Sequence, residues 1–161
     1  MTISFILNGE DEIINADPSQ RLIDILRNEF HLCGAKSGCL AGRCGVCSVM
    51  FNGAVSPSCI IPAFRIKASE IITIEGFSKN DEYKDIILGF KEANVENCGY
   101  CDAGKILTAE SLLSQNKLPS RNEITAALGG IKCRCTEVSS LCDGVIAAAV
   151  IRRRRLNVRN N

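Results

Sequence analysis

Apolar and polar side chains alternate over the first residues of the chain, as they do in a strand with one buried face. Every second residue from position 3 to position 7 is a large apolar one: Ile3, Phe5 and Leu7. Asn8-Gly9 follows, a dipeptide typical of two-residue hairpin turns, and residues 12–16 are expected to form the returning strand. The N-terminus therefore predicts a β-hairpin over residues 2–16.

A helical period replaces this alternation further along the chain. Apolar residues then recur three or four positions apart: Leu22, Ile23, Leu26 and Phe30. Ser19 is the expected N-cap of this helix, and His31 is expected to end it. Two more strands are expected at residues 48–51 and 71–74. The first half of the chain thus predicts a small sheet wrapped on one helix.

The second half of the chain has almost no strand signal. Two amphipathic helices are indicated by apolar residues at helical spacing: Tyr83, Ile86, Ile87 and Phe90, and then Ile106, Leu107, Ala109, Leu112 and Leu113. Ser120 and Glu123 form a capping box that begins a third helix, and Gly129-Gly130 ends it. A fourth helix is expected from residue 138 to about residue 153.

This pattern predicts an α+β chain in two parts. A mixed strand and helix domain is expected at residues 1–77, a polar linker at 78–84, and a four-helix domain with a basic tail at 85–161. The hydrophobic share of 46% is sufficient for packed cores.

Charge and hydropathy exclude two classes of function. Nineteen basic and 18 acidic residues leave a net charge of +1, which argues against a nucleic-acid-binding protein. No apolar run approaches the roughly 20 residues that a membrane-spanning helix needs, so no membrane insertion is expected. Residues 1–13 lack a basic leader and a long apolar run, so we expect no signal peptide and a cytoplasmic location. The basic run at residues 152–155 is interpreted as a solvated helix end, with an electrostatic dock for a partner subunit as the alternative.

Ten cysteines are the feature of this chain that points to chemistry. In a reducing compartment they do not indicate a disulfide framework, and metal ligation is the better interpretation. Five of them lie between residues 33 and 59, and the other five between residues 98 and 142. This division predicts one metal site in each half of the chain.

Four cysteines of the first group are spaced C-x4-C-x2-C-x11-C: Cys39, Cys44, Cys47 and Cys59. This is the plant-type ferredoxin spacing for a [2Fe–2S] cluster, in which each of two irons takes two thiolates. The glycines among them, Gly38, Gly42 and Gly45, allow backbone N–H groups to point at the sulfur atoms. Structural zinc, which also accepts four thiolates, is the alternative.

The second group contains a C-x2-C pair and a C-x-C pair. Their members are Cys98, Cys101, Cys133 and Cys135. Both pairs lie where helices are expected to begin, and the free N–H groups of a helix N-terminus favour thiolates and an anionic cluster. On spacing alone this second set leaves both a cluster and zinc open. Cys33 and Cys142 are left over and are interpreted as small buried hydrophobic residues, with a spare ligand as the alternative for Cys33.

The stretch GCLAGRCGVC followed by Cys59, then NCGYC, then KCRCT, closely resembles the small iron–sulfur subunits of the molybdenum hydroxylases. That family includes xanthine dehydrogenase, aldehyde oxidoreductase, nicotinate dehydrogenase, carbon monoxide dehydrogenase and 4-hydroxybenzoyl-CoA reductase. The resemblance spans residues 2–150 and implies a β-grasp ferredoxin domain followed by an all-α four-helix domain, each with one [2Fe–2S] cluster. It implies ligands Cys39, Cys44, Cys47 and Cys59 for the first cluster, and Cys98, Cys101, Cys133 and Cys135 for the second.

The resemblance also implies two partner subunits. A large subunit would bind molybdopterin near the second cluster, and a medium subunit would bind FAD near the first. Cys135 and Asn97 would contact the pterin, although Asn97 stands where the family has a glutamine that is one methylene longer. Other departures from the family pattern also flank the second cluster: Asp102-Ala103 for Thr-Pro, Ile131-Lys132 for Asn-Leu, and Glu137-Val138 for Gly-Tyr.

The expected function is electron transfer between the molybdopterin and FAD, without a catalytic residue in this chain. The expected substrate of the whole enzyme is a purine or other N-heterocycle, ahead of an aldehyde, carbon monoxide or an aromatic acyl-CoA. A free-standing two-cluster electron carrier or redox sensor is the alternative, and a zinc-dependent interaction module is a third interpretation. Arg43, Lys132 and Arg134 lie beside ligands and are expected to raise the potentials of their clusters.

Overall fold

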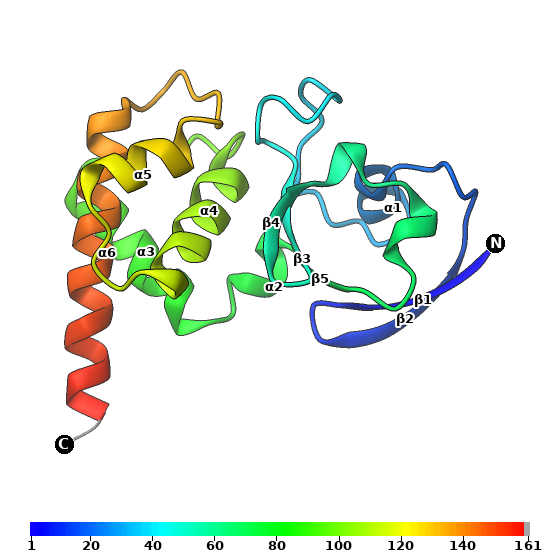
Figure 1. Cartoon of the computed structure of the whole chain (residues 1–161), viewed down its shortest axis with the longest axis horizontal. Helices are drawn as coiled ribbons and strands as arrows, with labels where there is room; N and C mark the ends of the chain where they lie inside the picture. The colour runs from blue at the N-terminus through cyan, green and yellow to red at the C-terminus, as the bar shows by residue number, and fades with distance from the viewer. Residues whose placement is uncertain (160–161) are drawn as a thin grey trace.

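The computed structural model describes residues 1–159, which form a sheet-containing half and a helical half side by side (Figure 1). The strands are β1 (Thr2–Leu7), β2 (Glu10–Asn15), β3 (Ser48–Phe51), β4 (Ala54–Pro57) and β5 (Glu70–Ile72). They form one sheet of order β2-β1-β5-β3-β4. Strands β1 and β5 are parallel, and the other three pairs of neighbouring strands are antiparallel.

Helix α1 (Leu22–Asn28) covers one face of this sheet. The alternation in β1 buries Ile3, Phe5 and Leu7, which share a core with the buried residues of α1. Asn8 and Gly9 take positive φ values of 53° and 90°, so the expected turn joins β1 to β2. A mixed sheet wrapped around one helix confirms the β-grasp expectation for the first half.

Several local predictions in this half are wrong. The N-cap of α1 is Arg21 and not Ser19, because the Ser19 backbone N–H donates to Asp17 Oδ1 at 2.8 Å in a local turn. The helix ends at Asn28, so His31 lies beyond it with a φ of 56°. The sequence pattern also failed to indicate β4 and the short helix α2 (Ile74–Phe77), which are too short to show a period. Two 3-10 turns, Ser58–Ile60 and Ala63–Ile66, complete this half.

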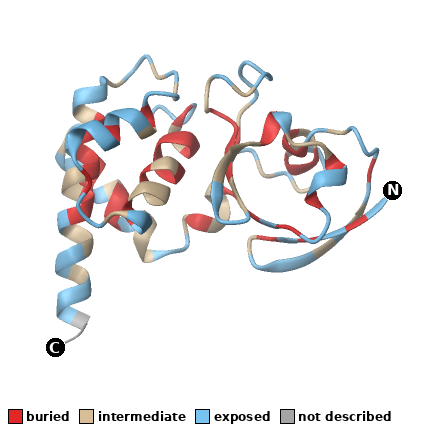
Figure 2. Ribbon diagram, viewed as in Figure 1, coloured by how far each residue is buried: buried red, intermediate tan, exposed pale blue. Residues whose placement is uncertain are grey.

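The helical half contains α3 (Asp81–Glu92), α4 (Asp102–Gln115), α5 (Arg121–Leu128) and α6 (Val138–Arg159). Its apolar side chains form a separate core, and Figure 2 shows buried residues on the inward faces of these helices. The capping box of Ser120 and Glu123 is present at the start of α5. The prediction of a four-helix unit is therefore confirmed. Within residues 1–159, none of the helices combines the length and apolar character that a bilayer crossing requires.

Helix α6 continues past the predicted end at residue 153 because charged groups hold its last turns against α3 and α4. Arg155 Nη2 lies 2.7 Å from Asp85 Oδ2 and 3.0 Å from Glu82 Oε1. Arg152 Nη2 lies 2.5 Å from Glu110 Oε2, and its Nε lies 3.4 Å from Asp85. Asp85 is only 2% exposed. These contacts raise the pKa of Arg155, the hydrogen bond to Asp85 being the largest cause.

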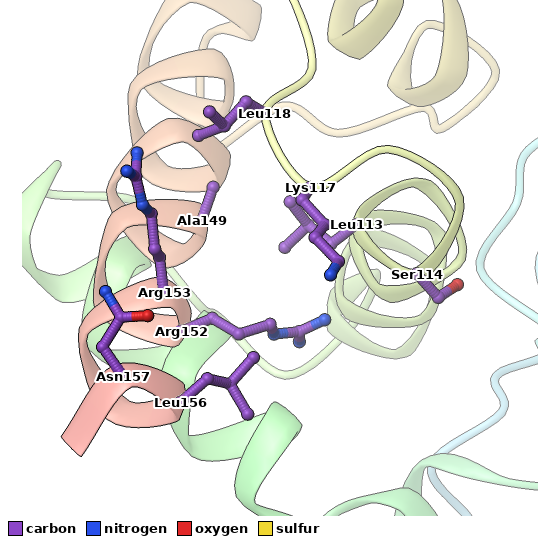
Figure 3. Close-up of a pocket in the computed structure, with 9 residues that line it drawn as sticks. All are labelled: Leu113, Ser114, Lys117, Leu118, Ala149, Arg152, Arg153, Leu156 and Asn157. Atoms are coloured by element: carbon purple, nitrogen blue, oxygen red, sulfur yellow. The ribbon is translucent and has the colours of Figure 1, made fainter. Parts of the chain in front are cut away.

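The interpretation of residues 152–155 as a solvated basic run is therefore wrong for two of the four arginines. Arg152 and Arg155 are three positions apart and share one face of α6, so both reach the acidic groups, whereas Arg153 and Arg154 are exposed. A groove of about 520 Å³ lies between the end of α4 and the last turns of α6. Figure 3 shows Arg152 reaching from α6 toward α4 within it.

Candidate iron–sulfur sites

The first cysteine-rich loop joins α1 to β3 and has no regular secondary structure. Leu40, Gly42 and Gly45 take positive φ values of 52°, 70° and 73°, which turn the chain repeatedly between the cysteines. Cys47 directly precedes β3, and Cys59 lies in the 3-10 turn after β4. The sheet thus fixes these two buried cysteines, while Cys39 and Cys44 belong to the more exposed part of the loop.

Backbone N–H groups of this loop point at the sulfur atoms. Arg43 N donates to Cys39 Sγ at 3.2 Å, and Ala41 N donates to the same atom at 3.4 Å. These bonds lower the pKa of Cys39 to about 6, the bond from Ala41 being the largest cause. Gly42 N reaches Cys59 Sγ at 3.3 Å, and Cys39 N reaches Cys44 Sγ at 3.4 Å. The loop is therefore shaped to stabilise thiolates and an anionic group bound to them.

The four thiols of the first site associate two by two. Cys39 interacts with Cys44, and Cys47 interacts with Cys59. Burial raises the pKa of Cys47 to about 11, and the Cys59 side chain adds to that increase. Two pairs of thiols, joined by the Gly42 backbone, fit a [2Fe–2S] rhomb because each of its irons takes two thiolates.

The second site is built in the same way from two other loops. Cys98 lies in the loop before α4, Cys101 is the N-cap of α4, and the other two cysteines lie between α5 and α6. Cys101 interacts with Cys133, and Cys98 interacts with Cys135. Burial raises the pKa of Cys101 to about 12, and the Cys133 side chain also raises it. Two further thiol pairs therefore meet at the N-terminus of α4.

No group of three or more His, Cys, Asp or Glu side chains in the described chain surrounds a position for a single metal ion. The eight cysteines predicted as ligands lie near one another in pairs, and the assignment of two sets of four ligands stays a prediction. The prediction that Cys33 is buried is wrong, because its side chain is exposed. Cys142 is 2% exposed and packs in the helical core, where its Sγ lies 3.4 Å from Thr125 Oγ1.

Comparisons with known proteins agree with these two sites. Residues 21–95 match the family model of a 2Fe-2S iron-sulfur cluster binding domain, and residues 73–146 match that of a [2Fe-2S] binding domain. The nicotinate dehydrogenase small FeS subunit of Eubacterium barkeri is 43% identical over 136 residues, covering 84% of this chain and 87% of that protein. A probable xanthine dehydrogenase subunit of Bacillus subtilis is 36% identical, covering 94% of this chain and 84% of that protein.

A solved structure extends the match to the whole fold. Quinoline 2-oxidoreductase from Pseudomonas putida 86 superposes with a TM-score of 0.87 at 35% identity, over 96% of this chain and 96% of the matched chain. This chain belongs to the small iron–sulfur subunits of the molybdenum hydroxylases. It binds two [2Fe–2S] clusters and is the electron-transfer part of an oxidoreductase, separate from the substrate-binding subunit. Aldehyde oxidoreductases are also among the relatives of this iron–sulfur subunit.

The two cysteine-bearing loops of this iron–sulfur subunit touch each other directly. Lys132 N donates to Cys44 O at 3.0 Å, so a residue next to one cysteine of the second site bonds to a cysteine of the first. Gly104 on α4 faces the Gly45 carbonyl so closely that a Cβ atom at Gly104 would lie 2.3 Å from that oxygen. In Figure 1 the cyan loop that contains residues 39–47 accordingly stands beside α4 and the loop before α6.

Sequence reasoning missed Lys105, which lies beside the second site. Its side chain is 0% exposed, and Nζ donates to Glu96 O at 2.7 Å and to Asn97 Oδ1 at 3.1 Å. Asp102 Oδ1 lies 3.0 Å from the same nitrogen. A lysine four residues after Cys101, among the apolar positions of α4, was the signal that could have revealed it. Asn97 and Cys135 are exposed, and their contact with a pterin stays a prediction.

Arg134→Ala is expected to lower the reduction potential of the second centre slightly, because Arg134 stands between two of its proposed ligands, Cys133 and Cys135, in the sequence. Arg134 is exposed, so salt screens its charge, and the shift should shrink as ionic strength rises. Potentiometric titration of the assembled enzyme at low and high salt measures both effects. An unchanged potential at low salt would contradict this role for Arg134.

Proposed function

We propose that this chain carries electrons, one at a time, between a large molybdopterin-binding subunit and a medium FAD-binding subunit. The proposed ligands are Cys39, Cys44, Cys47 and Cys59 in the first site, and Cys98, Cys101, Cys133 and Cys135 in the second. The observation that carries the proposal is the association of these thiols two by two, in loops that are bonded to each other through Lys132 and Cys44. When bound, each [2Fe–2S] cluster supplies a one-electron redox centre.

The residues around the thiols define what the chain contributes. N–H groups of Ala41 and Arg43 favour negative charge at Cys39, and buried neighbours keep water from Cys47 and Cys101. Each site has a buried side and an exposed side, with Cys39 exposed in the first and Cys98 and Cys135 exposed in the second. We propose that the exposed sides face the FAD and molybdopterin subunits respectively. We also propose two cluster-binding domains, at residues 1–77 and 85–161, with the second extended back to Asp81 because α3 begins there, inside the predicted linker at 78–84.

The proposed substrate of the whole enzyme is a purine or another N-heterocycle. Nicotinate, xanthine and quinoline, the compounds in the names of three matched proteins, are all N-heterocycles. Turnover assays of the complex purified with this chain should show oxidation of such compounds in preference to aldehydes. A complex that oxidises only aldehydes would contradict the substrate proposal and leave the electron-transfer proposal intact.

Cys39→Ala and Cys98→Ala are expected to remove one cluster each, because either change leaves one iron with a single protein thiolate. The wild-type chain should carry about four irons, and each variant about two. Iron analysis and electron paramagnetic resonance of the dithionite-reduced protein measure this, with one signal missing in each variant. Cys33→Ala is the matched control and should keep both signals.

The alternatives give different results in the same preparation. A free-standing electron carrier would purify with both signals but without a molybdenum subunit and a flavoprotein. A zinc-dependent interaction module would be colourless and would give no paramagnetic signal. Loss of both signals in Cys33→Ala, or of neither in Cys98→Ala, would contradict the ligand assignment.

A further inference from the structure

Lys105 has a buried, positively charged side chain, and lysine is rarely buried in proteins. It lies in α4, one helical turn after Cys101, and no part of its side chain is exposed. Burying an ammonium group is costly unless it is paired and hydrogen-bonded. Here Nζ contacts a backbone carbonyl of Glu96, the Asn97 side chain and one oxygen of Asp102. The fold therefore provides two hydrogen-bond acceptors and one ionic partner to hold one positive charge beside the second site.

The Asp102 carboxylate makes an ionic contact with Lys105 but no hydrogen bond to it. Asp102 Oδ2 accepts a hydrogen bond from Gly99 N at 2.8 Å, and so ties the carboxylate to the Cys98–Cys101 loop. Asp102 Oδ1 is buried and makes only the ionic contact with Nζ, without hydrogen-bond geometry. Asp102 is also the more exposed member, at 18% against 0% for Lys105, so solvent screens it more.

Hydrogen bonds tie the lysine to both segments that carry the thiols of the second site. Lys105 N donates to Cys101 O at 3.1 Å. Glu96 O accepts from Lys105 Nζ at 2.7 Å and from the hydroxyl of Thr136, the residue after Cys135, at 3.0 Å. The buried ammonium group is therefore held beside the loops of the second site, where solvent screens its charge little.

We propose that Lys105 is a built-in counter-charge of the second [2Fe–2S] cluster, which holds the reduction potential of that cluster above the value it would have without the lysine. The proposal rests on the ligand assignment given above. Reduction adds one negative charge to the cluster, and a buried cation stabilises that charge more than the oxidised form. Lys105 acts through its field and by positioning Glu96 and Asn97, next to Cys98. It makes no step of the reaction itself.

Lys105→Met and Asp102→Asn test this proposal because they change the local charge in opposite directions. In the assembled enzyme, Lys105→Met should lower the potential of the second cluster, and Asp102→Asn should raise it. At a fixed potential near the midpoint, the ratio of reduced to oxidised second cluster should fall about tenfold in Lys105→Met, which corresponds to about 59 mV for a one-electron centre. Redox titration followed by paramagnetic resonance measures both shifts, with signals assigned from Cys39→Ala and Cys98→Ala.

The controls separate charge from structure. Lys117→Met makes the same chemical change just beyond the opposite end of α4, roughly 18 Å away along the helix direction, and should leave both potentials unchanged. The first cluster provides a second control within each variant. A structural disturbance would move both test variants in the same direction, and that result would overturn the proposal, as would an unchanged potential in Lys105→Met.

One variant decides the question if the other fails to assemble. Should Lys105→Met lose the second cluster, a higher potential in Asp102→Asn supports the proposal, and an unchanged or lower one overturns it. A wild-type enzyme with a single paramagnetic centre contradicts the ligand assignment and this proposal together. Two centres with unshifted potentials in the variants contradict this proposal alone.

Discussion

Asp85→Asn is expected to lower the free energy of unfolding of the helical half by about 3 kcal/mol, the largest stability change predicted for a single charge in this chain. Asp85 is almost fully buried and lies between Arg152 and Arg155. Removing its negative charge leaves the largely buried guanidinium groups of Arg152 and Arg155 with fewer ionic partners. A buried charge without a partner destabilises the fold by more free energy than the lost attraction alone. The last turns of α6 should then separate from α3.

Asp143→Asn is the matched control, because Asp143 also pairs with an arginine but at the surface. The side chains of Arg121 and Asp143 are 57% and 52% exposed, so this pair should contribute less than about 1 kcal/mol. Thermal unfolding at a fixed scan rate compares the two variants. Equal midpoints for Asp85→Asn and Asp143→Asn would show that the buried ion pairs do not hold α6 in place.

Gly104→Ala is expected to slow electron transfer between the two clusters, while each keeps its iron. The new Cβ would lie 2.3 Å from the Gly45 carbonyl oxygen, and both groups belong to backbone that has little room to yield. The first loop must move away from α4, which strains the bond from Lys132 N to Cys44 O. Rapid-freeze paramagnetic resonance after substrate addition measures the delay between reduction of the second cluster and of the first.

Gly130→Ala is the control for this experiment, since Gly130 also flanks the second site but a Cβ there meets nothing within 4 Å. It should leave the rate unchanged. The prediction would be wrong if Gly104→Ala transferred electrons as fast as Gly130→Ala. Equal loss of iron in both variants would instead indicate damage to the second site.

The sequence predicts the main elements because apolar residues recur at a regular spacing along each of them, as in the alternation of β1. A specific local motif, the capping box of α5, is also present in the structure. The prediction failed where a local hydrogen bond decides the backbone conformation, as at Ser19, whose N–H donates to Asp17 Oδ1. The cysteine spacing predicted two [2Fe–2S] sites, and the two matched family models agree with that number, while the ligand residues stay a prediction. The sequence does contain a signal for Lys105, a lysine among apolar positions of a helix, but its contacts with Glu96 and Asn97 are evident only in the structure.

The bond between Lys132 N and Cys44 O joins two peptide groups and no side chains. Any amino acid with a backbone N–H can supply the donor, so position 132 is free to change its side chain, and proline alone would abolish the link. The chain can therefore carry Ile131-Lys132 and keep this link between its two cysteine-bearing loops. The contact between the loops depends on the main chain and not on the identity of the side chain at position 132.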